Sequence, residues 1–179
     1  MQHLPTPQTR QALVGAIPNL RAFALALCGD PVRADDLVQE TLVKAWHKLD
    51  TFEEGTSLKS WLFTILRNTF YSEYRRRRRE TSDPDGEHAA KLKSQPSQHS
   101  ALELNELMKA MDLLPPDQRE ALLLVGAEGL AYEEVAAITG CAVGTVKSRV
   151  NRARAKIAKM LDGETNDLPG DRPRTSLTA

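Results

Sequence analysis

Apolar residues recur at steps of three and four along most of this chain. That spacing gathers them on one side of a helix with 3.6 residues per turn. The pattern therefore predicts an all-α protein. The stretches that carry it are residues 10–28, 31–49, 57–68, 101–114, 117–129, 132–139 and 143–160.

Residues that stop or start helices separate these stretches. Gly29 should end the first helix, and Asp30 should cap the next one, with Pro31 at its first position. Pro18 lies inside the first helix and should kink it or restart it. Gly55 breaks the chain after the second helix.

The second helix should bury one side and expose an acidic one. Segment 30–54 holds seven acids and three bases. An acidic face is usually only solvated, but next to a DNA-binding module it would repel phosphate, so it indicates a basic protein partner. The residues expected inside are Leu37, Val38, Leu42, Ala45, Trp46 and Leu49. Those expected outside are Asp35, Asp36, Gln39 and Glu40.

The third helix leads into an aromatic and basic segment. Asn68 and Thr69 interrupt the apolar pattern, and five consecutive arginines follow at 75–79. A solvated helix end is the alternative, because cations suit the C-terminal dipole. Five at once exceed that need, and arginines beside aromatic rings suit single-stranded or unwinding DNA.

Segment 132–161 predicts a helix-turn-helix. Gly140 can take the positive φ of a sharp helix exit, and Ala136 is small enough for a close partner helix. With Val146, their spacing fits a motif whose second helix enters a DNA major groove. The alternative is a pair of core helices with a solvated basic face, but unbroken charge of one sign favours an anion opposite. The expected inner stripe is Val143, Val146, Val150, Ala153, Ile157 and Met160, and the outer cations are Lys147, Arg149, Arg152, Arg154, Lys156 and Lys159.

Residues 80–100 contain only three apolar residues and cannot bury a core, so we expect a flexible linker. It would join a domain at 10–79 to a second at 101–161, with a disordered tail at 162–179. As a random coil its ends average roughly 25 Å apart, whereas two turns of B-DNA cover about 70 Å. The linker therefore permits two DNA-binding modules to lie two turns apart without holding them there.

Composition narrows the function further. The formal net charge is zero, so the uneven distribution of charge is the informative quantity. The two cysteines and four histidines fit no zinc spacing, and no nucleophile–base pair is evident. No apolar run reaches the roughly 18 residues of a membrane span, and the N-terminus lacks a signal peptide. We expect a soluble intracellular protein without metal, cofactor or catalytic residues.

Three segments occur in order: DDLVQETLVKAW, SWLFTILRNTFYSEYRRRRR and LPPDQREALLLVGAEGLAYEEVAAITGCAVGTVKSRVNRAR. Together they resemble bacterial sigma factors of the extracytoplasmic-function group, reduced to regions two and four, over about residues 10–161. The first domain is similar to the general-stress members. The resemblance implies a non-catalytic, cytoplasmic factor that binds core RNA polymerase and promoter DNA, helps open the duplex and is held by an anti-sigma factor.

The resemblance also assigns residues to three surfaces. The core-polymerase surface is Asp36, Gln39 and Glu40. Contacts to the −10 element are Arg67, Asn68, Tyr71, Arg75 and Arg76. Contacts to the −35 element are Lys147, Ser148, Asn151 and Arg152, with Arg149, Arg154 and Lys156 on phosphates.

Two other functions are compatible with parts of this pattern. A stand-alone helix-turn-helix regulator would not need the acidic segment 30–54 and should bind duplex DNA unaided. A sigma-like decoy domain of an anti-anti-sigma regulator should be fused to a receiver domain and lack the DNA-contacting bases. The basic residues of segment 143–160 argue against the decoy.

One position departs from the family pattern. Members often carry Ser before the YEE segment, where this chain has Ala131. The loss of that half of a capping box should cost roughly 1 kcal/mol of helix stability. The DNA-reading helix should stay intact.

Overall fold

The computed structural model describes residues 6–53, 55–80 and 100–161, and within these ranges the chain is helical without strands. The predicted all-α class is confirmed. The predicted linker, apart from its two end residues, and the predicted tail lie outside the described residues. The helices are α1 (Pro7–Cys28), α2 (Pro31–His47), η1 (Leu49–Thr51), α3 (Leu58–Glu80), α4 (Ser100–Asp112), α5 (Pro116–Leu122), η2 (Leu123–Ala127), α6 (Tyr132–Thr139) and α7 (Val143–Leu161).

The predicted helix ends between α1 and α3 are confirmed. Gly29 has a φ of 67°, and its N–H donates to the Leu25 carbonyl at 2.8 Å. Asp30 caps α2, its carboxylate accepting from the Arg33 N–H at 2.8 Å. Gly55 has a φ of 92°, outside the range that side chains tolerate well. The α1–α2 corner and the bend before α3 are therefore set by local sequence.

The restart predicted as one possibility at Pro18 and the break predicted at Asn68 and Thr69 are absent. α1 runs without a restart across Pro18, because buried Leu13 and Leu20 on either side hold both halves of the helix against its neighbours. α3 is also continuous through Asn68 and Thr69. Thr69 is buried and its hydroxyl accepts from the Lys44 ammonium at 3.1 Å, so it is a satisfied core residue rather than a breaker.

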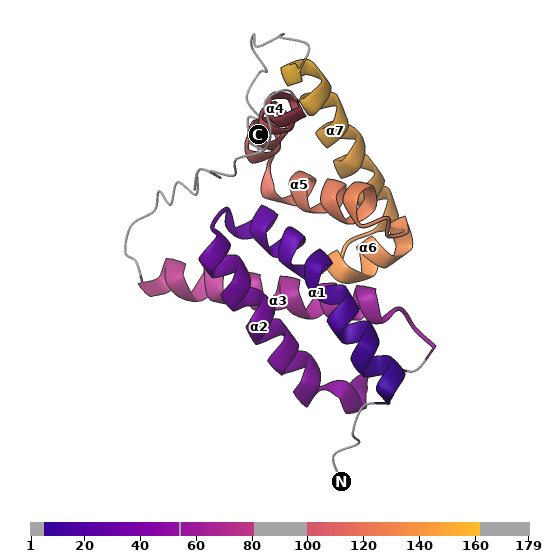
Figure 1. Cartoon of the computed structure of the whole chain (residues 1–179). Helices are drawn as coiled ribbons and strands as arrows, with labels where there is room; N and C mark the ends of the chain where they lie inside the picture. The colour runs from indigo at the N-terminus through magenta and orange to yellow at the C-terminus, as the bar shows by residue number, and fades with distance from the viewer. Residues whose placement is uncertain (1–5, 54, 81–99, 162–179) are drawn as a thin grey trace, which may run out of the picture.

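The first half of the molecule is a bundle of α1, α2 and α3 (Figure 1). Its centre is an edge-to-face pair of buried rings, Phe23 and Phe63, with centroids 5.1 Å apart. Trp46 was predicted to lie inside this bundle, but 48% of it is exposed. Ala45 is buried in the inward position, and the next residue, Trp46, is turned by about 100° around the helix axis.

α1 is as long and as apolar as a membrane-spanning helix. By length and composition alone its 22 residues could cross a membrane, contrary to the expectation that no apolar run is long enough. A core helix passes the same test. The apolar side of α1 carries Leu20, Phe23 and Ala24, which are buried against the bundle, and one helix that passes this test is weak evidence of a membrane span.

The second half is built around α7, which packs on α4, α5 and α6. Four residues of the predicted inner stripe, Val146, Val150, Ala153 and Ile157, are buried, and its two ends, Val143 and Met160, are half-buried. The helix–turn–helix of α6 and α7 is confirmed as well, with Gly140 at a φ of 67°. η2 continues α5 as a short π-helix that ends at Ala127, and Gly129 follows with a φ of 67°.

The two halves pack against each other rather than standing apart. α3 lies across the middle of the molecule, against α6 of the second half (Figure 1). Leu62 and Leu66 of α3 belong to the same buried apolar cluster as Leu124 and Val135. The interface is therefore part of one continuous core.

We predict that Phe63→Ala lowers the free energy of unfolding by about 3–5 kcal/mol, because it leaves a cavity against Phe23. Urea unfolding followed by circular dichroism measures the change. The matched control is Trp46→Ala, which removes a larger but half-exposed ring and should cost less than about 1 kcal/mol. Equal losses for the two variants would contradict this description of the core.

Candidate nucleic-acid and protein interfaces

α7 presents its polar residues away from the core. Lys147, Asn151, Arg152 and Arg154 are exposed, and Ser148 and Lys156 are half-buried. The Ser148 hydroxyl donates to the Thr145 carbonyl at 2.9 Å. The structure therefore gathers these predicted −35 residues on one helix with an outward-facing basic side.

Arg149 differs from the other cations of α7. Its guanidinium forms an ion pair with Asp117 of α5 at 3.0 Å and contacts the Cys141 sulfur at 3.5 Å. Asp117 is part of the same half of the molecule. Arg149 thus ties α7 to α5, a role that periodicity alone did not predict.

Glu134 compensates in part for Ala131 at the start of α6. Its carboxylate accepts from the Ala131 N–H at 2.9 Å, so half of the capping box persists. The other carboxylate oxygen accepts from the Ser60 hydroxyl of α3 at 2.7 Å. The Ser60 bond, and then the Ala131 bond, lower the pKa of Glu134. The cap of α6 is therefore also a contact between the two halves.

The predicted −10 residues on α3 fall into two groups. Asn68, Arg75 and Arg76 are exposed. Arg67 and Tyr71 instead face α5 of the second half, with the guanidinium 4.6 Å from the centre of the Tyr71 ring. This arrangement puts two of the five predicted residues at an internal interface.

Glu120 of α5 holds these two residues. The Arg67 Nε donates to its carboxylate at 2.7 Å, and the Tyr71 hydroxyl lies 3.5 Å from the second oxygen. Only 1% of Glu120 is exposed. Burial raises its pKa, against the pull of Arg67, and burial likewise raises the pKa of Tyr71 to about 12. Sequence periodicity could not identify Glu120, because its partners lie 49 and 53 residues away.

The outer side of α2 combines acids with apolar side chains. Asp36 and Gln39 are exposed, whereas half-buried Glu40 pairs with Lys44 at 2.6 Å. Val32, Val43 and Trp46 are 70%, 57% and 48% exposed. Residues 32, 36, 39, 43 and 46 follow at steps of four and three, which places them on one stripe. Exposed apolar groups in line with acids are typical of a protein-binding surface.

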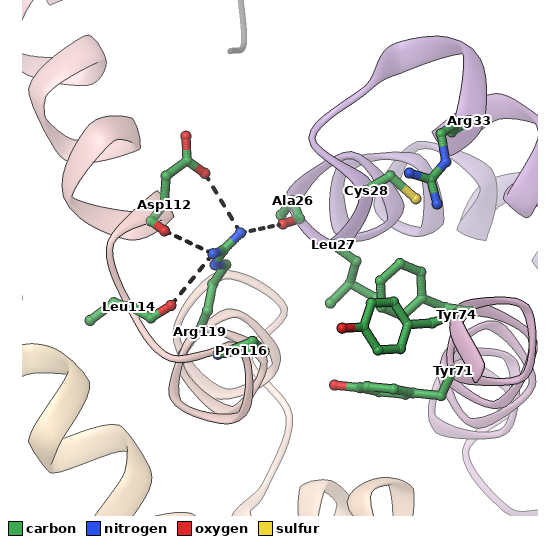
Figure 2. Close-up of a pocket in the computed structure, with 11 residues that line it drawn as sticks. Ala26, Leu27, Cys28, Arg33, Tyr71, Tyr74, Asp112, Leu114, Pro116 and Arg119 are labelled. Carbon is green, nitrogen blue, oxygen red and sulfur yellow. Dashed lines mark hydrogen bonds and ion pairs between the residues drawn. The ribbon is translucent and has the colours of Figure 1, made fainter. Parts of the chain in front are cut away.

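A pocket of about 380 Å³ lies between the halves, beside the Arg67–Glu120 contact. Figure 2 shows Tyr71 and Tyr74 on one wall and Arg119 opposite. The Arg119 guanidinium donates to the carbonyls of Ala26 at 3.3 Å and Asp112 at 3.0 Å. Arg119 therefore fastens the α4–α5 turn to the end of α1, which is a structural role.

Metal chemistry has no support in this geometry. Among the residues that the structure describes, no group of three or more His, Cys, Asp or Glu could hold a metal ion. Cys28 and Cys141 are free thiols, one buried and one half-buried. The structure thus presents exposed basic residues on α3 and α7, and exposed acidic and apolar residues on α2.

Comparison with known proteins agrees with this arrangement. The family described as Sigma-70 region 2 matches residues 14–80, and Sigma-70, region 4 matches residues 104–157. The ECF RNA polymerase sigma factor EcfG of Rhodopseudomonas palustris is 56% identical over 174 residues, covering 96% of both chains. The chain belongs to the extracytoplasmic-function sigma factors. As such it binds core RNA polymerase and promoter DNA and acts in transcription initiation.

More distant relatives support the same assignment. The ECF RNA polymerase sigma factor SigC of Mycobacterium tuberculosis is 37% identical over 149 residues, covering 82% of this chain and 78% of the relative. A solved structure of the sigma factor RpoE of Bartonella quintana, in complex with the anti-sigma factor NepR, is 50% identical. It covers 88% of this chain and 98% of its own, with a TM-score of 0.79.

We predict that Cys141 reacts with iodoacetamide well before Cys28 at pH 8.5. Burial raises the pKa of Cys28 to about 11, so its reactive thiolate is scarce until the pH approaches that value. Mass spectrometry of partly alkylated, folded protein measures the order. In urea the two rates should converge, and faster labelling of Cys28 in the folded protein would contradict its burial.

Proposed function

We propose that this chain reads a two-part promoter with two separate helices. α7 of the 101–161 domain would contact the −35 element, and α3 of the 10–79 domain the −10 element. The observation that carries the proposal is the outward side of α7, where Lys147, Asn151 and Arg152 are exposed opposite an apolar stripe that packs into the core. No acid lies between positions 143 and 160 to oppose phosphate.

Within α7 the geometry favours base contacts for some residues and phosphate contacts for others. Exposed Asn151 and Arg152, together with Lys147 and Ser148, are positioned for base edges, while Arg154 and Lys156 suit phosphates. Arg149 is held by Asp117, so we assign it to the support of α7 rather than to direct contact with DNA. On α3, exposed Asn68, Arg75 and Arg76 would meet the −10 element first.

α2 would bind the polymerase. Asp36 and Gln39, with Glu40 beside them, match the family surface that meets a basic coiled coil, and Val32, Val43 and Trp46 extend it with apolar contact area. A partly apolar, partly acidic face suits a protein better than DNA. This surface disfavours a stand-alone DNA-binding regulator, which has no use for it.

We further propose a cytoplasmic role in a stress response, under the control of an anti-sigma factor. The supporting observation is the 50% identical relative, which was solved in complex with the anti-sigma factor NepR. The 56% identical relative is named EcfG, a member of the same group. The chain itself would perform no chemistry, since phosphodiester synthesis belongs to the polymerase.

The function is tested by mixing the purified chain with core RNA polymerase and a promoter library, and sequencing the transcripts that appear. Transcripts sharing two spaced upstream motifs would support the proposal. DNA binding in the absence of polymerase, with no gain in transcription, would support the stand-alone regulator instead.

We predict that Asp36→Lys combined with Gln39→Lys weakens binding to core polymerase by about tenfold or more, roughly 1.4 kcal/mol. Two cations would then face a basic partner. Fluorescence anisotropy with labelled chain measures the affinity. Glu133→Lys, an exposed acid on α6, is the control for added positive charge and should bind normally. Wild-type affinity in the double variant would mean that this face of α2 is solvated surface and does not contact the polymerase.

We predict that Arg152→Ala costs about 1–3 kcal/mol at the preferred −35 sequence if its guanidinium reads a base edge. Binding is measured on the preferred −35 duplex and on variants of it, over a range of salt. A loss confined to particular base pairs confirms base readout. A uniform loss with a shallower salt dependence would make Arg152 a phosphate contact.

A further inference from the structure

The first two cations of α7 are held by neighbouring helices in different ways. The Arg149 guanidinium is paired with the Asp117 carboxylate of α5 at 3.0 Å, so an anion already compensates its charge. The Lys147 ammonium instead lies over the face of the Tyr132 ring of α6, 5.7 Å from the ring centre. A ring face attracts a cation through its quadrupole but carries no net charge. Lys147 is therefore held by α6 while it keeps its full positive charge.

The Tyr132 ring is itself fixed at the start of α6. It is half-buried and packs on the main apolar core of the molecule. The first turn of α6 is anchored as well, because the Glu134 carboxylate accepts from the Ala131 N–H at 2.9 Å and from the Ser60 hydroxyl of α3 at 2.7 Å. A ring that is packed on one side and carried by an anchored turn gives the flexible lysine a fixed surface to lie on.

The turn between α6 and α7 sets where Lys147 leaves its helix. The Ala136 carbonyl accepts from the N–H groups of Gly140 at 2.9 Å and Cys141 at 3.2 Å, and Gly140 has a φ of 67°. Val146, the residue before Lys147, is fully buried. Local bonds and core packing thus fix α7 against α6, and the Lys147 side chain extends toward the first turn of α6.

We propose that Tyr132 is a positioning residue for promoter reading, whose ring orients the Lys147 ammonium toward a base edge of the −35 element. The inference rests on the proposed assignment of Lys147 to that element. A lysine that is mobile in the free protein loses much rotamer freedom when DNA orders it. A lysine that already lies over a ring has lost part of this freedom before binding, so its ordering on DNA costs less.

The base that an oriented ammonium fits is guanine. In the major groove guanine presents two acceptors, N7 and O6, and the three donors of an ammonium can reach both. Adenine and cytosine each present an amino donor at that edge, which an ammonium cannot bond. A mobile lysine can instead turn to the nearest phosphate, which carries no sequence information. The ring should therefore contribute more to the choice of base pair than to nonspecific affinity.

The proposal is tested on the holoenzyme formed from the full chain and core RNA polymerase, bound to fluorescein-labelled promoter duplexes. One duplex carries the preferred −35 sequence, and the others carry single base-pair changes within it. We expect Tyr132→Leu to lower the affinity for the preferred sequence about threefold to fivefold. The loss should be confined to one G·C pair, the same pair at which Lys147→Ala loses discrimination. Tyr132→Phe keeps the ring face and should restore both affinity and discrimination.

A double-mutant cycle separates the contact from other effects of each substitution. Tyr132→Leu combined with Lys147→Ala should lose no more affinity than Lys147→Ala alone, because the ring then has no ammonium to orient. Lys159→Ala is the matched control, since Lys159 is another exposed lysine of α7, and its effect should add to that of Tyr132→Leu. Additive losses for Tyr132 and Lys147 would overturn the proposal.

Nuclear magnetic resonance gives a second readout, on the full chain without DNA. Protons above a ring face are shifted upfield by the ring current, so the side-chain Hε protons of Lys147 should resonate upfield of those of Lys159. Tyr132→Leu should remove this shift and Tyr132→Phe should keep it, with circular dichroism matching the wild type for both variants. A Lys147 resonance that Tyr132→Leu leaves in place would contradict the contact.

The outcomes also distinguish this inference from the proposed function. If Lys147→Ala binds every duplex as the wild type does, Lys147 does not read the −35 element and both fail. A loss at one base pair in Lys147→Ala, with none in Tyr132→Leu, would leave the −35 assignment standing and overturn the role of Tyr132. Equal losses in Tyr132→Phe and Tyr132→Leu would assign the effect to the hydroxyl group and overturn the role of the ring.

Discussion

A carboxylate sealed from water is the constraint on which the arrangement of this molecule depends. Glu120 is buried at the junction of two helical domains, and burial raises its pKa even with Arg67 beside it. Such a group tolerates little displacement of its partners, because any shift leaves a charge without a counter-charge. Together with the apolar cluster that the two halves share, it limits how α5 can pack on α3, and this packing covers Tyr71.

Much of the fold could be predicted from sequence because its determinants are local. Gly29, Asp30 and Gly140 fix corners through φ angles and caps that need no distant partner. The apolar stripe of α7 is buried as its spacing indicates. The packing of the two domains could not be predicted. It depends on pairs such as Ser60 with Glu134 and Lys59 with Glu128, which lie about 70 residues apart in the chain.

The sites were predictable only in part, for the same reason. Spacing places Lys147, Asn151 and Arg152 outside, and they are exposed. It does not distinguish a cation free for DNA from Arg149, which is held by Asp117. Trp46 shows the opposite error: spacing indicated burial, but Ala45 is the buried residue and Trp46 is 48% exposed. Periodicity identifies a face, whereas tertiary partners decide what each face does.

The chain has a formal net charge of zero, and part of this balance is local pairing of acids with arginines between helices. On α2, Asp36 is exposed, while Asp117 and Glu120 of α5 form ion pairs with Arg149 of α7 and Arg67 of α3. Any ligand that displaces Glu120 from Arg67 must place another anion beside this arginine, and the phosphates of promoter DNA are anions.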